Sequence, residues 1–173
     1  MTVSSRGSYR CRQINLFGDR TMPRTIVLFA VVLAAFGLAT PQASALDRYV
    51  SKGPGRLVIS GYDTTSYFNS GRPQRGQARH AVRWQGVTWR FKTPEEAAKF
   101  RANPTAFAPQ FGAYCTGGLS QHHAVDGNPR IYRIYNGRLY LFATHAGARR
   151  FDRNPGGTIR AARAYWNTLP IRR

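Results

Sequence analysis

A β-hairpin centred on Asn136-Gly137 is the feature that most constrains how this chain can fold. Apolar and polar residues alternate over 131–135 and again over 138–142, and only the Asn-Gly pair separates the two runs. Asn-Gly is the preferred sequence of a type I′ turn, whose twist matches that of two paired strands. The spacing therefore predicts two antiparallel strands joined by a tight turn.

A second hairpin is predicted upstream, over residues 80–91. Its turn is Gln85-Gly86, and the alternation places Trp84, Trp89 and other aromatic side chains on one face. We expect these rings to form core and hairpin faces. No internal repeat longer than the hairpin itself is expected.

Capping signals predict the helices. Thr93 and Glu96 match a capping box, so a helix should begin there and end at Asn103-Pro104, followed by one helical turn at most. Thr144 can cap a second helix that residues 155–157 break. Apolar residues at 159, 162, 166 and 169 predict a final amphipathic helix. A short helix should also follow the turn at 61–63, capped by Asp63.

These elements together predict an α+β fold, a small antiparallel sheet of two β-hairpins packed with short helices and a C-terminal amphipathic helix. Residues 46–60 are expected to be a lead-in, because 52–55 can form no regular element. The domain should span 61–169, and 170–173 should form a basic tail.

The N-terminal 45 residues are predicted to be a signal segment. Residues 25–39 form an uncharged apolar run, and Ala43-Ser44-Ala45 follows it. A membrane span needs roughly 20 apolar residues, so the run better matches a secretory signal, with cleavage after Ala45. Translation would start at Met1 or at Met22. We expect a periplasmic or secreted protein with no stable transmembrane span after processing; a retained anchor is the alternative.

The charge of the chain is strongly positive. The formal net charge is +19, from 26 Lys and Arg residues against 7 Asp and Glu. An exported protein of this charge is expected to meet an anionic membrane surface or cell-wall polymer. A solvated basic surface without a partner is the alternative. Arginines interleaved with aromatic residues on the strands also suit single-stranded nucleic acid, but export argues against that partner.

Three ordered segments carry a resemblance to a known family. They are GYDTTSYF at 61–68, TWRF at 88–91 and NPTAFAPQFGAYC at 103–115. Together they resemble the YHS domain, and in particular its exported branch, which includes members described as selenoproteins. The resemblance implies a small domain for which metal binding has been proposed. Metal-associated YHS domains use more than one cysteine, whereas the domain here has Cys115 alone.

Cys115 is the candidate functional residue, since Cys11 would be lost with the leader and no internal disulfide can form. His122 and His123 follow it closely, and a thiolate with an imidazole suits copper or zinc. Adjacent histidines diverge on an extended backbone, so only one should join Cys115. A closed zinc site would need further ligands, such as His80 or His145.

Three functions remain open at this point. The first is a non-enzymatic module that binds a metal ion or a partner through Cys115. The second is a thiol-dependent redox protein, which would work through a mixed disulfide or sulfenic acid because no resolving cysteine is present. The third is a structural or envelope-binding basic module without metal, in which Cys115 packs as a small apolar group.

Overall fold

The computed structural model describes residues 46–52 and 55–172. The predicted signal segment, its cleavage site, Met22 and Cys11 lie outside the described residues. Within them, no helix is long and apolar enough to cross a bilayer.

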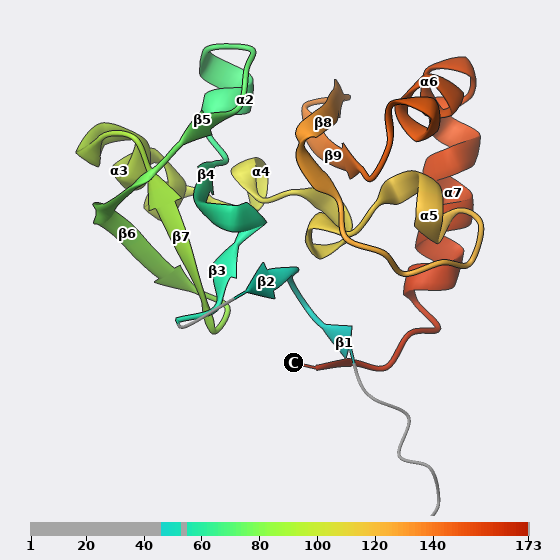
Figure 1. Cartoon of the computed structure of the whole chain (residues 1–173), viewed down its shortest axis with the longest axis horizontal. Helices are drawn as coiled ribbons and strands as arrows, with labels where there is room; N and C mark the ends of the chain where they lie inside the picture. Colours follow the sequence, from blue (N-terminus) through green and yellow to red (C-terminus); the bar gives the residue numbers. More distant parts are fainter. Residues whose placement is uncertain (1–45, 53–54, 173) are drawn as a thin grey trace, which may run out of the picture. The chain divides into compact units, whose positions relative to one another are not determined.

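The described chain contains two copies of one hairpin-and-helix unit (Figure 1). In the first copy, strands β6 (Gln77–Trp84) and β7 (Val87–Phe91) lead into helix α3 (Pro94–Ala102). In the second, β8 (Asn128–Tyr135) and β9 (Arg138–Phe142) lead into α6 (His145–Arg153). Every boundary in the second copy lies 51 residues after its counterpart in the first. The chain therefore contains an internal structural repeat.

The repeat extends to the irregular details of each unit. The strand pairing of both hairpins shifts register at the same place, between Gln77 and Ala81 and between Asn128 and Tyr132. A short 3-10 helix precedes each unit, η1 (Ile59–Gly61) and η2 (Gln110–Ala113). Its last three residues all have positive φ, at 43°, 55° and 77° in η1 and 53°, 60° and 72° in η2.

The same backbone hydrogen bond closes each unit onto its 3-10 helix. Gly76 donates to the Gly61 carbonyl and Gly127 donates to the Ala113 carbonyl, both at 2.9 Å. A Cβ atom at Gly76 would collide with the Arg90 backbone of β7, and one at Gly127 would collide with the Ala113 carbonyl and Leu141, so both positions require glycine. Because the same irregularities occur at equivalent positions, the two units share one backbone structure.

The expectation that no repeat exceeds the hairpin is therefore wrong. The strands hide it, because equivalent positions carry different apolar or aromatic residues, such as Trp89 and Tyr140. The residues that set turns, caps and core are identical at a spacing of 51: Gly76/Gly127, Gly86/Gly137, Phe91/Phe142, Thr93/Thr144, Ala97/Ala148, Phe100/Phe151, Asn103/Asn154 and Pro104/Pro155.

Both helices begin and end as their caps predict. The Thr93 hydroxyl accepts from the Glu96 N–H group and the Glu96 carboxylate accepts from Thr93, which confirms the capping box. The Thr144 hydroxyl accepts from Gly147 N–H at 3.1 Å. Each helix is followed at once by another that an Asn caps and a Pro begins: α4 (Pro104–Phe107) and α7 (Pro155–Trp166).

The final helix begins earlier than the sequence pattern indicated. Residues 155–157 were expected to interrupt the helical structure. Pro155 is instead the first residue of α7, where its missing N–H group costs nothing. The Asn154 side chain accepts from Gly157 N–H at 2.9 Å and satisfies the first turn. Leu169 lies beyond the end of α7 at Trp166 and packs there as part of the irregular tail.

The core follows the repeat. Phe100 packs on Trp89 and Phe91, each with ring centroids 4.9 Å away. Its counterpart Phe151 packs on Tyr140 at 5.5 Å and Phe142 at 5.1 Å. Each helix is thereby held against the hairpin that precedes it, and two clusters of buried side chains result.

The α+β class is confirmed, with small sheets and separate helices. The described strands form one four-stranded sheet, in the order β2 (Ser51–Lys52), β3 (Leu57–Val58), β7, β6, and three two-stranded sheets. The latter pair β1 (Leu46–Asp47) with β10 (Ile171–Arg172), β4 (Tyr62–Asp63) with β5 (Gln74–Arg75), and β8 with β9. The β3–β7 and β1–β10 pairings are parallel, whereas an antiparallel sheet was expected.

The segment expected to be a lead-in belongs to the core. Tyr49, Val58 and Ile59 are at most 7% exposed and pack in the first cluster. Alternation over so few residues is too short to predict a strand from sequence. The tail expected at 170–173 likewise supplies β10.

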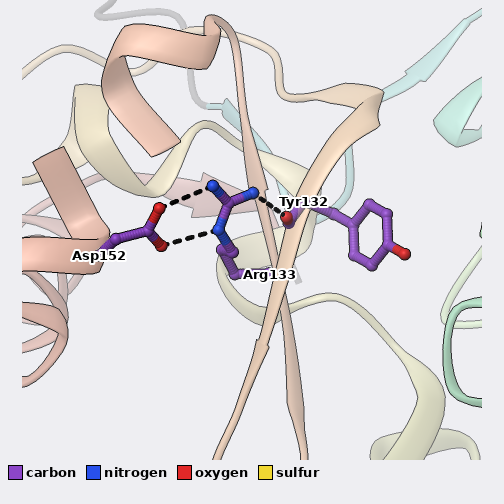
Figure 2. Close-up of polar contacts among 3 residues, drawn as sticks. All are labelled: Tyr132, Arg133 and Asp152. Carbon is purple, nitrogen blue, oxygen red and sulfur yellow. Dashed lines mark hydrogen bonds and ion pairs between the residues drawn. The ribbon is translucent and has the colours of Figure 1, made fainter. Parts of the chain in front are cut away.

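An ion pair ties α6 to the second hairpin (Figure 2). The Arg133 guanidinium on β8 donates two hydrogen bonds to the Asp152 carboxylate, both at 2.7 Å, and a third to the Tyr132 carbonyl at 2.8 Å. These bonds hold the pKa of Asp152 below its ordinary value. The first unit has Val82 and Arg101 at the equivalent positions and makes no such pair.

Candidate functional site

Cys115 lies where three elements of the second unit meet. It is the N-cap of the one-turn helix α5 (Thr116–Leu119), and it bridges to Leu141 on β9. Its sulfur accepts hydrogen bonds from two backbone N–H groups, those of Gly118 and Ala143, each at 3.2 Å. Only 4% of the residue is exposed. Two N–H donors aimed at one sulfur can stabilise negative charge when that sulfur acts as a nucleophile or a metal ligand.

The repeat identifies Asp63 as the counterpart of Cys115. Asp63 Oδ2 accepts from Lys92 N–H at 2.8 Å, and Lys92 is the residue 51 positions before Ala143. Asp63 Oδ1 accepts from the Thr65 N–H and hydroxyl groups at 2.8 and 2.7 Å. The same backbone position after the second strand of each hairpin thus donates to a carboxylate in one unit and to a sulfur in the other.

A difference at one helix position separates the two sites. In the first unit, Glu96 on α3 lies against Asp63, and the pKa of Glu96 is raised to about 7 by desolvation and by its hydrogen bond to the Asp63 carboxyl group. In the second unit the equivalent residue is Gly147, which has no side chain. A Cβ atom added there would meet only Thr144 Oγ1 within 4 Å, at 3.4 Å.

A cavity of about 390 Å³ opens beside Cys115 in the second unit. That volume lies within the range of small-molecule sites, about 300–1,000 Å³. Its lining residues are Cys115, Gly117, Gly118, Gln121, His123, Val125, Ala143, Thr144, Ala146, Gly147, Arg150, Phe151 and Thr158. They include the first turn of α6 and one arginine, and they include no carboxylate. The positive end of the α6 dipole and the Arg150 guanidinium make this cavity suited to negative charge.

The structure separates the two predicted histidine ligands. His123 lines the cavity together with Cys115. The His122 ring instead stacks on Tyr165 of α7, with ring centroids 4.9 Å apart, and its backbone has a φ of 62°. Of the two histidines, His123 alone lines the Cys115 cavity, and the backbone at His122 forms a turn where an extended backbone was expected.

The further ligands needed for a closed zinc site are not assembled in the described part of the chain. No group of three His, Cys, Asp or Glu side chains there lies close enough to hold a metal ion. His80 accepts a hydrogen bond from its neighbour Arg79 in the first hairpin, and His145 is exposed at the start of α6. Among the described residues, Cys115 and His123 are the thiol and imidazole groups that line this cavity.

Sequence reasoning missed the residues that make this site a cavity. None of these residues has a functional side chain. The backbone N–H groups of Gly118 and Ala143 donate to the Cys115 sulfur, and Gly147 leaves open space. The 51-residue spacing of Thr93/Thr144 and Phe100/Phe151 is the signal that would have revealed Gly147 in place of Glu96.

The chain matches no protein-family model, and no curated protein sequence or solved structure matches it. The resemblance to the YHS domain therefore stays a prediction that rests on the motifs themselves.

Proposed function

We propose that this protein is a non-enzymatic, exported YHS-like module that binds its ligand in the Cys115 cavity through a reversible mixed disulfide. One observation carries the proposal. In the first unit the Glu96 side chain fills the space beside Asp63, whereas in the second unit Gly147 leaves the equivalent space beside the Cys115 sulfur open. A purely structural copy has no need of the open space.

The surroundings of the sulfur support thiol exchange. In this reaction the Cys115 thiolate attacks one sulfur of a small disulfide, the bond between the two ligand sulfurs breaks, and the departing thiolate takes up a proton. The N–H groups of Gly118 and Ala143 can stabilise the attacking sulfur, and Arg150 lies in the same cavity. Because the described residues hold no second cysteine, the adduct would persist until another thiol releases it.

Intact-mass measurement tests this proposal. A full chain with Cys11→Ser, incubated with glutathione disulfide or cystine under native conditions, should gain one adduct that dithiothreitol removes. Adding Cys115→Ser should abolish the adduct. If Cys115 reacts only in denaturant, the sulfur is an inert core group and the proposal fails.

Soft metal binding is a second candidate, favoured because His123 lines the same cavity as Cys115. A Cu(I) ion held by sulfur and imidazole would be the cargo. Cys115→Ser and His123→Ala should then each weaken Cu(I) affinity in a competition titration, whereas His122→Ala should leave it unchanged because that ring stacks on Tyr165. Equal affinity in all four proteins would remove this candidate.

A further inference from the structure

A second and larger cavity, of about 500 Å³, lies apart from Cys115. Residues of both repeat units line it, together with residues near each end of the described chain, and they include Arg48, Trp84, Arg138, Arg163 and Trp166. All described residues, including both repeat units, belong to one compact domain.

The charge of this lining is of one sign. It includes three arginines, Arg48, Arg138 and Arg163, all exposed, and no aspartate or glutamate. Arg138 donates to the Thr105 carbonyl at 3.1 Å, which holds this long side chain near the cavity. Guanidinium groups are planar multiple donors that match carboxylate, sulfonate and phosphate oxygens. The lining therefore favours an anionic ligand.

Aromatic rings supply another part of the wall. Trp84 and Trp166 are only partly buried, and Tyr49 and Phe111 lie beside them, with centroids 5.7 Å apart for Tyr49–Trp84 and 6.1 Å for Phe111–Trp166. The Arg163 guanidinium lies 5.5 Å from the Phe111 ring centroid. Partly exposed rings next to cations suit a flat ring that carries negative charge, because the ring can stack while its acid group meets the guanidiniums.

The floor of the cavity is fixed by close backbone contact. Val50 donates to the Gly112 carbonyl at 2.8 Å, and Leu46 donates to the Pro170 carbonyl at 2.9 Å. These bonds hold the segment that carries Arg48 and Tyr49 against η2 and the chain's C-terminal strand. The arginines and rings thus converge on a built cavity and are not scattered over the surface.

We propose that this cavity binds a small aromatic acid, with its ring against Trp84 and Trp166 and its acid group on Arg48, Arg138 and Arg163. The proposal is independent of the one for Cys115, because the two cavities share no lining residue.

Fluorescence titration of the full chain with 8-anilinonaphthalene-1-sulfonate tests it. The neutral N-phenyl-1-naphthylamine has the same rings without the sulfonate and should bind about tenfold more weakly or worse. Arg48→Gln, Arg138→Gln and Arg163→Gln should each weaken sulfonate binding about two- to fivefold, as for exposed ion pairs. Arg101→Gln makes the same charge change on the exposed side of α3 and should have no effect.

Recognition of the ring needs its own comparison. Unlabelled 1-naphthalenesulfonate should displace the dye, and methanesulfonate at the same concentration should not. The proposal is overturned if Arg101→Gln weakens binding as much as the cavity variants, if the neutral dye binds equally well, or if methanesulfonate displaces the dye as effectively.

Discussion

Replacing Glu96 by glutamine should remove a pH dependence of folding that the first unit creates. Desolvation of the Glu96 carboxyl group and its hydrogen bond with the Asp63 carboxyl group raise the pKa of Glu96 to about 7, and the Thr93 N–H group, which donates to Glu96, opposes this shift. The folded protein therefore holds the Glu96 proton more tightly than the unfolded chain does. Its contribution to the free energy of unfolding is full below about pH 4.5 and is lost as pH rises through about 7.

The size of this contribution to the free energy of unfolding depends on the pKa shift of Glu96 and on how far the side chain is exposed to solvent. A pKa that rises from 4.5 to about 7 corresponds to an upper bound of about 3 kcal/mol. Glu96 is only half-buried, so screening by water lowers our expectation to about 1 kcal/mol. Glutamine can keep both contacts, since its carbonyl accepts from Thr93 and its amide donates to Asp63, but it cannot ionise.

Urea unfolding followed by tryptophan fluorescence between pH 4 and pH 8 measures this difference. Wild type and Glu96→Gln should be equally stable at pH 4, and the variant should be more stable by about 1 kcal/mol at pH 8. Glu95→Gln is the matched control in the same helical turn, because Glu95 is exposed and its pKa is lowered, by its hydrogen bond to Thr93 first of all. A Glu96→Gln variant with the pH profile of wild type would refute the reasoning.

Three further predictions concern other parts of the chain. Gly112→Ala should lower the free energy of unfolding in urea by more than about 2 kcal/mol, because the new Cβ would collide with the Arg48 backbone. Gly86→Ala also has positive φ but open space around it, so it should cost only about 1 kcal/mol. Equal losses in the two variants would contradict this. Sedimentation with anionic vesicles should show binding that falls steeply between low and physiological salt, with none to neutral vesicles, and salt-independent binding would leave only solubility as the role of the charge. N-terminal sequencing of the exported protein should begin at Leu46, and an intact Met1 or Met22 would refute the predicted cleavage.

Local signals predicted both hairpins and the helices that follow them. Asn136-Gly137 has positive φ at both residues, as a type I′ turn requires, and the capping box at Thr93 forms as written in the sequence. These features succeed because a turn or cap depends on a few neighbouring residues. The short strands β1 and β3 could not be predicted, because they pair with the distant strands β10 and β7.

The candidate site was predicted only in part. Cys115 was identified from its chemistry, but the separation of His122 from His123 arises from a turn at His122 that the sequence analysis did not predict. The rest of the site consists of N–H groups and of a missing side chain at Gly147, which a search for reactive residues passes over. Only the comparison of one unit with the other shows that the position above the sulfur is open.

The rate at which Cys115 reacts with a neutral disulfide tests the central claim most directly. Full chains with Cys11→Ser would be mixed with 4,4′-dithiodipyridine under native conditions, and release of thiopyridone followed by absorbance. Gly147→Ala should react at nearly the wild-type rate, whereas Gly147→Glu, which recreates the Glu96 arrangement, should react about tenfold more slowly or worse, since attack would then need a local opening. Equal rates in all three proteins, rising together with denaturant, would mean that Cys115 reacts only on unfolding and that the cavity is not a binding site.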